Sequence, residues 1–201
     1  MARILFLPGA GASASFWRPV GDLLPQSWPK HFFAWPGLGD EPADPSINGI
    51  DDLVGMVCDQ LDQPADIVAQ SMGGLVALKA VLQRPEKVSR LVLTGTSGGV
   101  PVEALGGADW RTEYRREYPG AASWITELRE DLSGALPTIS APTLLLWGDR
   151  DQISPVAVGE RLRDLLPDAT LRVIAGGQHD FPQTHSAEVA APIQQHLAAM
   201  S

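Results

Sequence analysis

The sequence predicts an α/β fold, a doubly wound and mostly parallel sheet of six strands with helices on both faces. Short apolar runs alternate with amphipathic stretches of helical period along most of the chain. The apolar runs show no polar alternation, which is typical of parallel strands that helices cover on both sides. A chain of 201 residues, 44% of them hydrophobic and 19% charged, has enough apolar material for one large core, so we expect a single domain.

The expected strands are short runs, often β-branched, most of which end at Gly or Pro. They are residues 4–7, 32–35, 67–69, 91–94, 143–147 and 171–175. The amphipathic stretches between them predict helices at residues 16–24, 50–61, 72–82, 155–166 and 186–199. Pro155 suits the first turn of its helix, whereas Pro192 lies inside the last helix and should kink or split it.

Residues 97–141 interrupt this alternation with an insertion that has no convincing strand. Its aromatic residues lie among charged and glycine-rich segments. An insertion after the fourth strand would lie over the carboxyl ends of the sheet, where ligands bind in open α/β folds. We expect either a short helical lid or a helical excursion that packs its aromatic residues on the core. The side chains expected to contribute to a substrate pocket are Trp17, Trp110, Tyr114 and Trp124.

Charge and cysteine content exclude several classes of protein. A net charge of −9 argues against nucleic acid or an anionic membrane surface as a partner, because both are bound by clustered Lys and Arg. The single cysteine, Cys58, allows no internal disulfide and fits the buried face of a helix. Pro8 ends the first apolar run too early for a signal peptide, and no later run approaches the roughly 20 residues that span a bilayer. We therefore expect a cytoplasmic protein.

Ser71 stands where an apolar run meets an amphipathic one. A strand that turns at once into a helix forces the residue at the corner into a strained conformation and projects its side chain beyond the sheet. Ala69 and Gly73, two positions to either side, are small enough for such a corner. The pattern predicts a nucleophilic serine at the N-terminus of a helix, where N–H groups favour a developing anion.

A nucleophilic serine needs an imidazole base, and the chain has four histidines. His31 precedes a strand and so lies at the wrong end of the sheet, and His196 falls in the final helix. His179 follows the sixth strand on a loop at the end where Ser71 should lie, which makes it the expected base. His185, at the start of the final helix, is the next candidate.

The acid that orients the base is expected after the fifth strand, where Asp149 and Asp151 are both in reach. Asp149 directly follows Gly148 and fits a turn, so Asp151 is favoured. For the oxyanion, the donors expected are the N–H of Met72, next to the nucleophile, and the N–H of Ala10 in the glycine-rich loop after the first strand. By itself, that loop could also be a turn without a ligand.

These segments together resemble the α/β-hydrolase fold family. Residues 69–74 are similar to its G-x-S-x-G-G elbow, and residues 7–11 to its L-H-G-x-G loop. Residues 34–40 look like its D-x-P-G-x-G segment, residues 84–88 like its H-P-E-x-V link, and residues 142–155 like the segment with the catalytic aspartate. The likeness covers nearly the whole chain except the insertion, and within the family it is greatest to the small carboxylesterases.

The resemblance implies Ser71 as nucleophile, Asp151 as acid and His179 as base. It also implies a six-stranded sheet without the family's two leading strands, with residues 32–35 on an edge. Two residues depart from the pattern. Ala69 replaces a glycine, which is a small change, whereas Pro8 replaces the histidine that usually braces the oxyanion loop.

We therefore expect a serine hydrolase that cleaves a carboxylic ester, thioester or lactone through an acyl-enzyme. Neither a metal nor a cofactor is indicated, because the histidines lack ligand spacing and there is no cysteine pair. The expected partner is a small ester-like molecule, and the sequence carries no signal for oligomeric state. The alternatives are a sensor that keeps the triad but turns over little, and a lyase, C–C hydrolase or perhydrolase on the same scaffold.

Overall fold

The computed structural model describes residues 2–199, and within them it contains one six-stranded sheet in the order β2-β1-β3-β4-β5-β6. All neighbouring strands pair in parallel. The strands are β1 (Arg3–Leu7), β2 (Lys30–Phe32), β3 (Ala65–Gln70), β4 (Val88–Thr94), β5 (Thr143–Gly148) and β6 (Ala169–Ile174). The predicted parallel sheet is confirmed, and β2 forms one of its edges.

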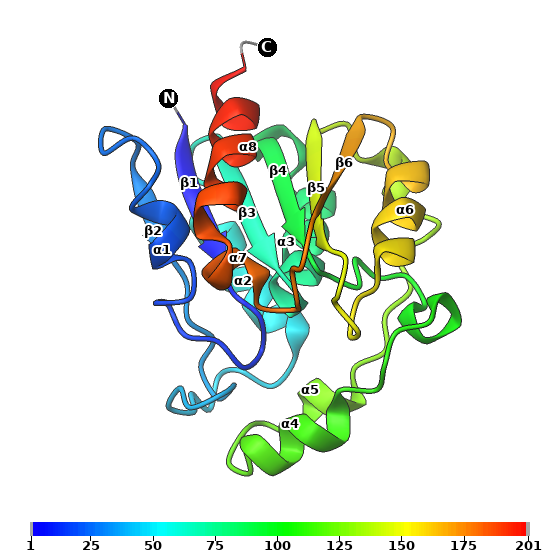
Figure 1. Cartoon of the computed structure of the whole chain (residues 1–201). Coiled ribbons are helices and arrows are strands. Elements are labelled where there is room, and N and C mark those ends of the chain that lie inside the picture. The colour runs from blue at the N-terminus through cyan, green and yellow to red at the C-terminus, as the bar shows by residue number, and fades with distance from the viewer. Residues whose placement is uncertain (1, 200–201) are drawn as a thin grey trace.

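Helices cover both faces of this sheet, and each side has its own apolar core (Figure 1). One face is covered by α1 (Arg18–Gly21), α7 (Phe181–Thr184) and α8 (Ser186–Ala198). The other face is covered by α2 (Ile50–Asp59), α3 (Met72–Gln83) and α6 (Val156–Leu165). The longest helix, α8, has 13 residues, and no helix in residues 2–199 is long and apolar enough to cross a membrane.

Three elements differ from the sequence-based expectation. The helix expected at 16–24 shortens to α1, because i→i+3 hydrogen bonds form tighter turns on both sides of it. The strand expected at 32–35 ends at Phe32, although Phe33 still donates its N–H to the carbonyl of Phe6. Helix α8 contains Pro192 and is not split there.

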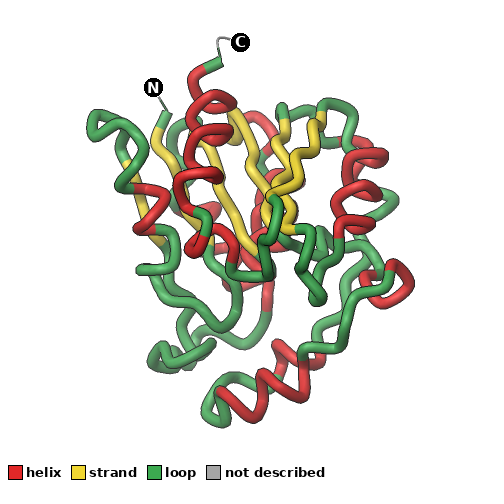
Figure 2. The backbone as a smooth tube through the Cα atoms, in the orientation of Figure 1, coloured by secondary structure: helices red, strands yellow, loops and turns green. Residues whose placement is uncertain are grey.

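The segment between β4 and β5 forms only short helices joined by loops, as Figure 2 shows. They are the 3-10 turns η2 (Val102–Leu105) and η3 (Leu136–Thr138), with α4 (Arg111–Glu117) and α5 (Trp124–Glu127) between them. A further 3-10 turn, η1 (Pro85–Lys87), precedes β4. In Figure 1 this segment lies beyond the carboxyl ends of the strands, where the sequence placed it.

Candidate active site

Ser71 occupies the corner between β3 and α3. Its φ of 53° and ψ of −125° make it the only non-glycine residue with positive φ among residues 2–199. Its N–H donates to the carbonyl of Thr94 (3.0 Å), and its own carbonyl accepts from the N–H of Gly74 (2.9 Å). The residue thus ends the strand ladder and begins the helix at once, in a conformation that costs about 1–3 kcal/mol.

Glycines allow the chain to close tightly around this corner. A Cβ on Gly73 would lie 2.5 Å from the carbonyl oxygen of Pro8, so α3 can pack against the end of β1 only without a side chain there. A Cβ on Gly9 would lie 2.5 Å from Oε1 of Gln70 and 3.0 Å from Cβ of Ser71. The loop after β1 therefore passes too close to the serine to carry a side chain at position 9.

His179 and Asp151 join Ser71 in one hydrogen-bonded chain. Nε2 of His179 lies 3.0 Å from Oγ of Ser71, and Nδ1 lies 2.8 Å from Oδ2 of Asp151. Oδ1 of Asp151 accepts the N–H groups of Ile153 and Ser154, each at 2.9 Å. The carboxylate is completely buried, whereas the imidazole is a quarter exposed. The corner after β3 and the loops after β5 and β6 thus bring a hydroxyl, a carboxylate and an imidazole together.

The other candidates lie elsewhere. Oδ1 of Asp149 accepts the N–H of Gly176 (2.7 Å), and this bond joins the loop after β5 to the loop after β6. His185 bonds to the hydroxyl of Thr184 through Nδ1 (3.0 Å) at the start of α8. His196 lies in α8, and burial lowers its pKa. None of these three side chains contacts Ser71.

A pocket of about 1170 Å³ opens beside Ser71 and His179, and Ala10 and Met72 both line it. Its apolar wall comes from α3 and the insertion: Leu75, Val100, Val102, Trp110, Ile125 and Leu128. Trp110 and Tyr114 line it as expected, and Tyr118 lines it too.

Two of the expected pocket side chains are placed differently. Trp17 is 1% exposed in the core on the face of the sheet that α1, α7 and α8 cover. Its Nε1 donates there to the carbonyl of Leu7 (3.0 Å). Trp124 packs partly buried against the core on the α3 side and is not among the residues that line the pocket. Aromatic rings are favoured in a core as much as in a pocket, so residue type alone did not separate the two.

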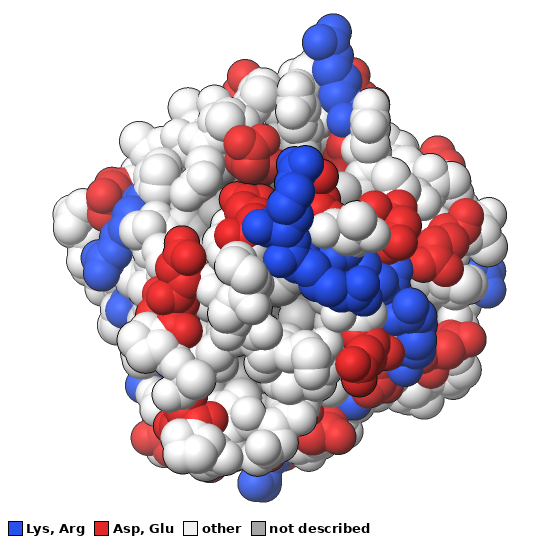
Figure 3. Space-filling view, turned by 90° about the horizontal axis from the view of Figure 1, so that it is seen from below, with Lys and Arg blue, Asp and Glu red and all other residues white. Residues whose placement is uncertain are grey.

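Charge around the pocket mouth is mixed. Figure 3 views this side of the molecule, where a band of Lys and Arg side chains is flanked by Asp and Glu. Two of the arginines form ion pairs: Arg111 contacts Glu103 (2.9 Å) and Asp109 (3.1 Å), and Arg116 contacts Glu113. This face therefore presents no continuous field of one sign.

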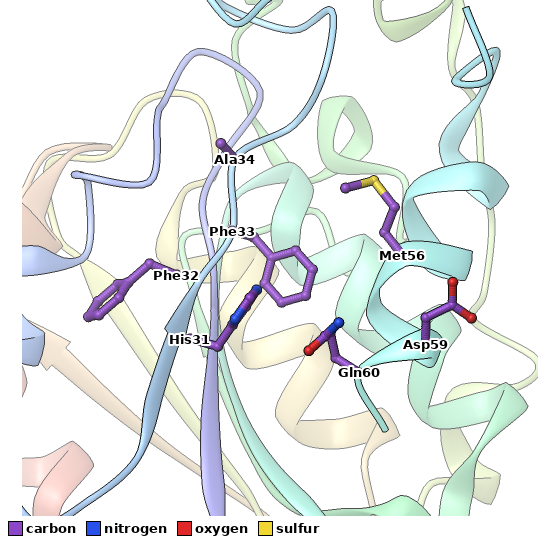
Figure 4. Close-up of a pocket in the computed structure, with 7 residues that line it drawn as sticks. All are labelled: His31, Phe32, Phe33, Ala34, Met56, Asp59 and Gln60. Atoms are coloured by element: carbon purple, nitrogen blue, oxygen red, sulfur yellow. The ribbon is translucent and has the colours of Figure 1, made fainter. Parts of the chain in front are cut away.

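A second hollow, of about 310 Å³, lies between β2 and α2 (Figure 4). In the picture His31 lies beside Phe33, and their ring centroids are 4.7 Å apart. Met56, Asp59 and Gln60 line the opposite side from α2 and the residue after it. The burial of His31, with Arg3 nearby, lowers its pKa. His31 was expected to precede the strand but lies within β2, apart from Ser71.

A family model described as "Alpha/beta hydrolase family" matches residues 4–191. The chain belongs to the alpha/beta hydrolase family. Two of its similar relatives are named pimeloyl-[acyl-carrier protein] methyl ester esterase. The relative from Neisseria meningitidis serogroup A is 28% identical over 94% of this chain and 74% of its own length. The relative from Chromobacterium violaceum is 26% identical over 96% of this chain and 93% of its own length.

Solved structures of other alpha/beta hydrolases share the fold. A bacterial membrane phospholipase A matches 98% of this chain and 78% of its own, with a TM-score of 0.82 at 21% identity. A thermophilic esterase from Thermogutta terrifontis matches 98% of this chain and 89% of its own, with a TM-score of 0.76 at 20% identity. At these identities the likeness extends to the fold.

One contact in this alpha/beta hydrolase was missed by sequence reasoning. Gln70, the residue before the serine, is 3% exposed and donates from Nε2 to the carbonyl of His179 (3.1 Å). It therefore joins the end of β3 to the loop that carries the imidazole. A polar residue in the last position of a buried strand, directly before the serine, was the signal that could have identified it.

Proposed function

We propose that this alpha/beta hydrolase cleaves a carboxylic ester through an acyl-enzyme on Ser71. The observation that supports this most directly is the unbroken chain of hydrogen bonds from Asp151 through His179 to Ser71. Relatives named as esterases across most of this chain support an ester as the bond that is broken. We also propose that the chain acts as a single domain in which residues 97–141 cover the pocket.

In the acylation step, Oγ of Ser71 attacks the ester carbonyl while Nε2 of His179 takes the hydroxyl proton. The buried carboxylate of Asp151 orients the ring and stabilises the imidazolium that forms. The tetrahedral intermediate collapses when the C–O bond to the alcohol breaks, and the imidazolium gives its proton to the leaving oxygen.

In the deacylation step, water replaces the alcohol. Nε2 of His179 takes a proton from the water, and the hydroxide so formed attacks the acyl carbonyl. Collapse of the second intermediate breaks the bond to Oγ, which regains a proton from the imidazolium. The products are one carboxylic acid and one alcohol, and the side chains return to their starting state.

The oxyanion in both steps would be held by the N–H groups of Ala10 and Met72. Met72 is the first residue of α3, so its N–H has no partner inside the helix and is available to an anion. Both residues line the same pocket as Ser71. A pair of such donors is typical of acyl transfer, where losing one lowers the turnover number by about 10²- to 10³-fold.

A fluorophosphonate probe tests the proposal, because it reacts with an activated serine and requires no guess at the natural substrate. We expect labelling at Ser71 in wild type and none in Ser71→Ala. Ser97→Ala is the matched control, since Ser97 lines the same pocket but its hydroxyl accepts from the N–H of Gly99 (3.5 Å). Labelling at another residue would contradict the assignment.

Turnover of p-nitrophenyl esters then separates an enzyme from a sensor. An enzyme releases many equivalents of nitrophenol per chain, whereas a protein that stops after about one equivalent only binds and is acylated. We expect continued release in wild type, and loss of about 10⁴- to 10⁶-fold in Ser71→Ala. A stop after one equivalent would overturn the hydrolase proposal.

A further inference from the structure

The loop after β1 has nearly every carbonyl held by a donor, and most of these donors are aromatic side chains. Nε1 of Trp17 donates to the carbonyl of Leu7 (3.0 Å), and Nε1 of Trp35 to that of Pro8 (2.8 Å). The next carbonyl, of Gly9, accepts the N–H of Ala12 (3.2 Å). Both tryptophans are essentially buried, at 1% and 0% exposed, so these bonds are shielded from water.

The last two carbonyls of the loop are held from the insertion. The hydroxyl of Tyr114 donates to the carbonyl of Ala10 (3.0 Å), and that of Tyr118 donates to the carbonyl of Gly11 (3.0 Å). The Tyr114 hydroxyl also accepts the N–H of Gly39 (2.9 Å). One phenol therefore joins the loop after β1, the segment after β2 and helix α4.

Holding these carbonyls determines where the N–H groups point. A trans peptide is planar, and its C=O and N–H are directed to opposite sides. The Ala10 N–H belongs to the peptide of the Gly9 carbonyl, which lies between a peptide held by Trp35 and one held by Tyr114. With both neighbours fixed, the plane between them has little freedom to turn.

We propose that Tyr114 and Tyr118 are positioning residues, which aim the Ala10 N–H at the oxyanion by fixing the carbonyls of Ala10 and Gly11. This inference rests on the proposed function of the same site. It also explains the departure at Pro8, where a histidine usually braces this loop. In this chain the insertion supplies the brace.

The environment of the two tyrosines suits this role. Tyr114 is 8% exposed, and its ring lies 5.0 Å from that of Tyr118 between centroids. Tyr118 is the residue that directly follows α4, and its N–H donates to the carbonyl of Tyr114 (2.8 Å), so the two side chains lie close together at the end of the helix. Burial raises the pKa of Tyr114, and burial together with Glu117 raises that of Tyr118 to about 12, so both phenols stay protonated and donate.

Contacts with the loop after β1 and the segment after β2 hold α4 in place. A Cβ on Gly11 would lie 3.0 Å from the ring of Tyr118, so the loop directly contacts the residue that follows α4. Ala122 donates its N–H to the carbonyl of Gly37 (2.8 Å) and adds a backbone tie between the insertion and the segment after β2. The insertion at α4 is then part of the catalytic framework and does not open as a lid during turnover.

The test removes the hydroxyls one at a time, in Tyr114→Phe and Tyr118→Phe, with active sites counted by fluorophosphonate. We expect kcat on p-nitrophenyl acetate to fall about tenfold and about threefold respectively, less than the loss of a whole donor. KM should stay within twofold, because the ground-state carbonyl uses the oxyanion donors weakly.

A boronic acid provides a measurement that loosened structure alone would not change. Phenylboronic acid accepts Oγ of Ser71 at boron, His179 takes the proton, and the tetrahedral adduct directs an oxygen at the oxyanion donors. Its inhibition constant should rise by the same factor as kcat falls. Hydrogen exchange of a peptide covering residues 8–15 should quicken in both variants.

Thr126→Val is the matched control within the insertion. Thr126 accepts from Nε of Arg115 (3.0 Å) and so joins α5 to α4 without contacting the loop. We expect its kcat and boronate affinity to stay within twofold of wild type. If Tyr114→Phe does not fold, Tyr118→Phe decides, because Tyr118 is only partly buried and its substitution removes the hydrogen bond to the carbonyl of Gly11.

Failure of the brace and failure of the proposed function give different results. Suppose that the wild type is active and that Tyr114→Phe and Tyr118→Phe keep kcat, boronate affinity and loop exchange within twofold. That result overturns only the positioning role of the two tyrosines. A folded wild type that neither turns over esters nor binds the boronate overturns the proposed function, and this role with it.

Discussion

The carboxylate of Asp151 has no exposed surface and faces the imidazole of His179 across 2.8 Å between Oδ2 and Nδ1. Two backbone N–H groups, from Ile153 and Ser154, occupy its other oxygen. A carboxylate held in this way can only accept, so Nδ1 of the ring must carry the proton. Nε2 is then the acceptor that faces the hydroxyl of Ser71.

Asp151→Asn should abolish most turnover without unfolding the protein. The amide keeps one oxygen for the two backbone donors, and its NH₂ then faces Nδ1, which forces the proton onto Nε2. That tautomer cannot accept from Ser71, so we expect kcat on p-nitrophenyl acetate to fall about 10³- to 10⁴-fold near neutral pH.

Asp149→Asn is the control for this change. Asp149 accepts one N–H, from Gly176, and an amide oxygen can replace its carboxylate there. We expect kcat to stay within about threefold. Equal losses in the two variants would mean that the loop after β5 acts through its shape and not through the Asp151 carboxylate.

Alanine substitutions at two helical glycines, Gly73 and Gly55, distinguish the cost of a steric clash from the gain in helix propensity. In Gly73→Ala the new methyl would meet the carbonyl oxygens of Pro8 (2.5 Å) and Leu7 (2.6 Å), so α3 must move away from β1. We expect urea denaturation to show a loss of about 1–3 kcal/mol in the free energy of unfolding. Since α3 carries the Met72 N–H, kcat should fall as well.

Gly55→Ala is the matched change in α2, where the added methyl meets nothing within 4 Å. It should raise the free energy of unfolding by about 0.5–1 kcal/mol, because alanine is the better helix former. Activity should be unchanged. A stabilised Gly73→Ala would show that the contact between α3 and β1 relaxes without cost.

The sequence could predict the sheet because its four inner strands, β1, β3, β4 and β5, are largely buried on both faces and contain continuous apolar runs. The predicted strand ends were less exact where apolar residues are buried without strand pairing. Phe33 and Trp35 are 4% and 0% exposed, yet β2 ends before both. Burial governs which residues are apolar, whereas pairing governs where a strand ends. The same limit applies to α1, whose flanking residues form tight turns.

The order of Ser71, Asp151 and His179 was predictable because each follows a strand and parallel strands end at one edge. The roles of the aromatic residues were not. Residue type did not distinguish Trp17, Tyr114 and Trp124. Trp17 donates to the end of β1 from the core, Tyr114 donates to the loop after β1 from α4, and Trp124 packs partly buried against the core. Such differences depend on long-range packing that no local pattern records.

Trp110 should favour binding of long acyl chains in the pocket. It lines the pocket from the residue before α4 and packs edge-on against Tyr114, with ring centroids 5.5 Å apart. Trp110→Ala removes apolar contact with a long chain, so KM for p-nitrophenyl octanoate should rise about tenfold while KM for the acetate changes little.

Trp124→Ala is the control, because this side chain is partly buried in the insertion without lining the pocket. It should lower the melting temperature and leave the ratio of octanoate to acetate KM unchanged. A change in that ratio for Trp124→Ala alone would place the acyl chain on the other side of the insertion.

The last prediction concerns Asp66, a carboxylate on β3 that is 1% exposed. Its Oδ1 has no hydrogen-bond partner within residues 2–199, and Nη1 of Arg90 lies 4.0 Å away. Burial raises the pKa of Asp66 from 3.8 to about 6, and the charge of Arg90 only partly offsets this. Between these two values the folded protein keeps a proton that the unfolded chain has lost. Unfolding then releases a proton, so this group lowers stability as pH rises from about 4 to about 6, and the full penalty persists above that.

Asp66→Asn stays neutral at every pH and should remove that penalty. Its free energy of unfolding should gain on wild type between pH 4.5 and pH 7.5, by at most about 3 kcal/mol since one pKa unit is worth 1.36 kcal/mol. Urea denaturation at the two pH values measures the gain, and Asp22→Asn, at an exposed position, provides the control. A difference between Asp66→Asn and wild type that is the same at both pH values would show that the carboxyl titrates alike in the folded and unfolded chain, and that water reaches it in spite of its burial.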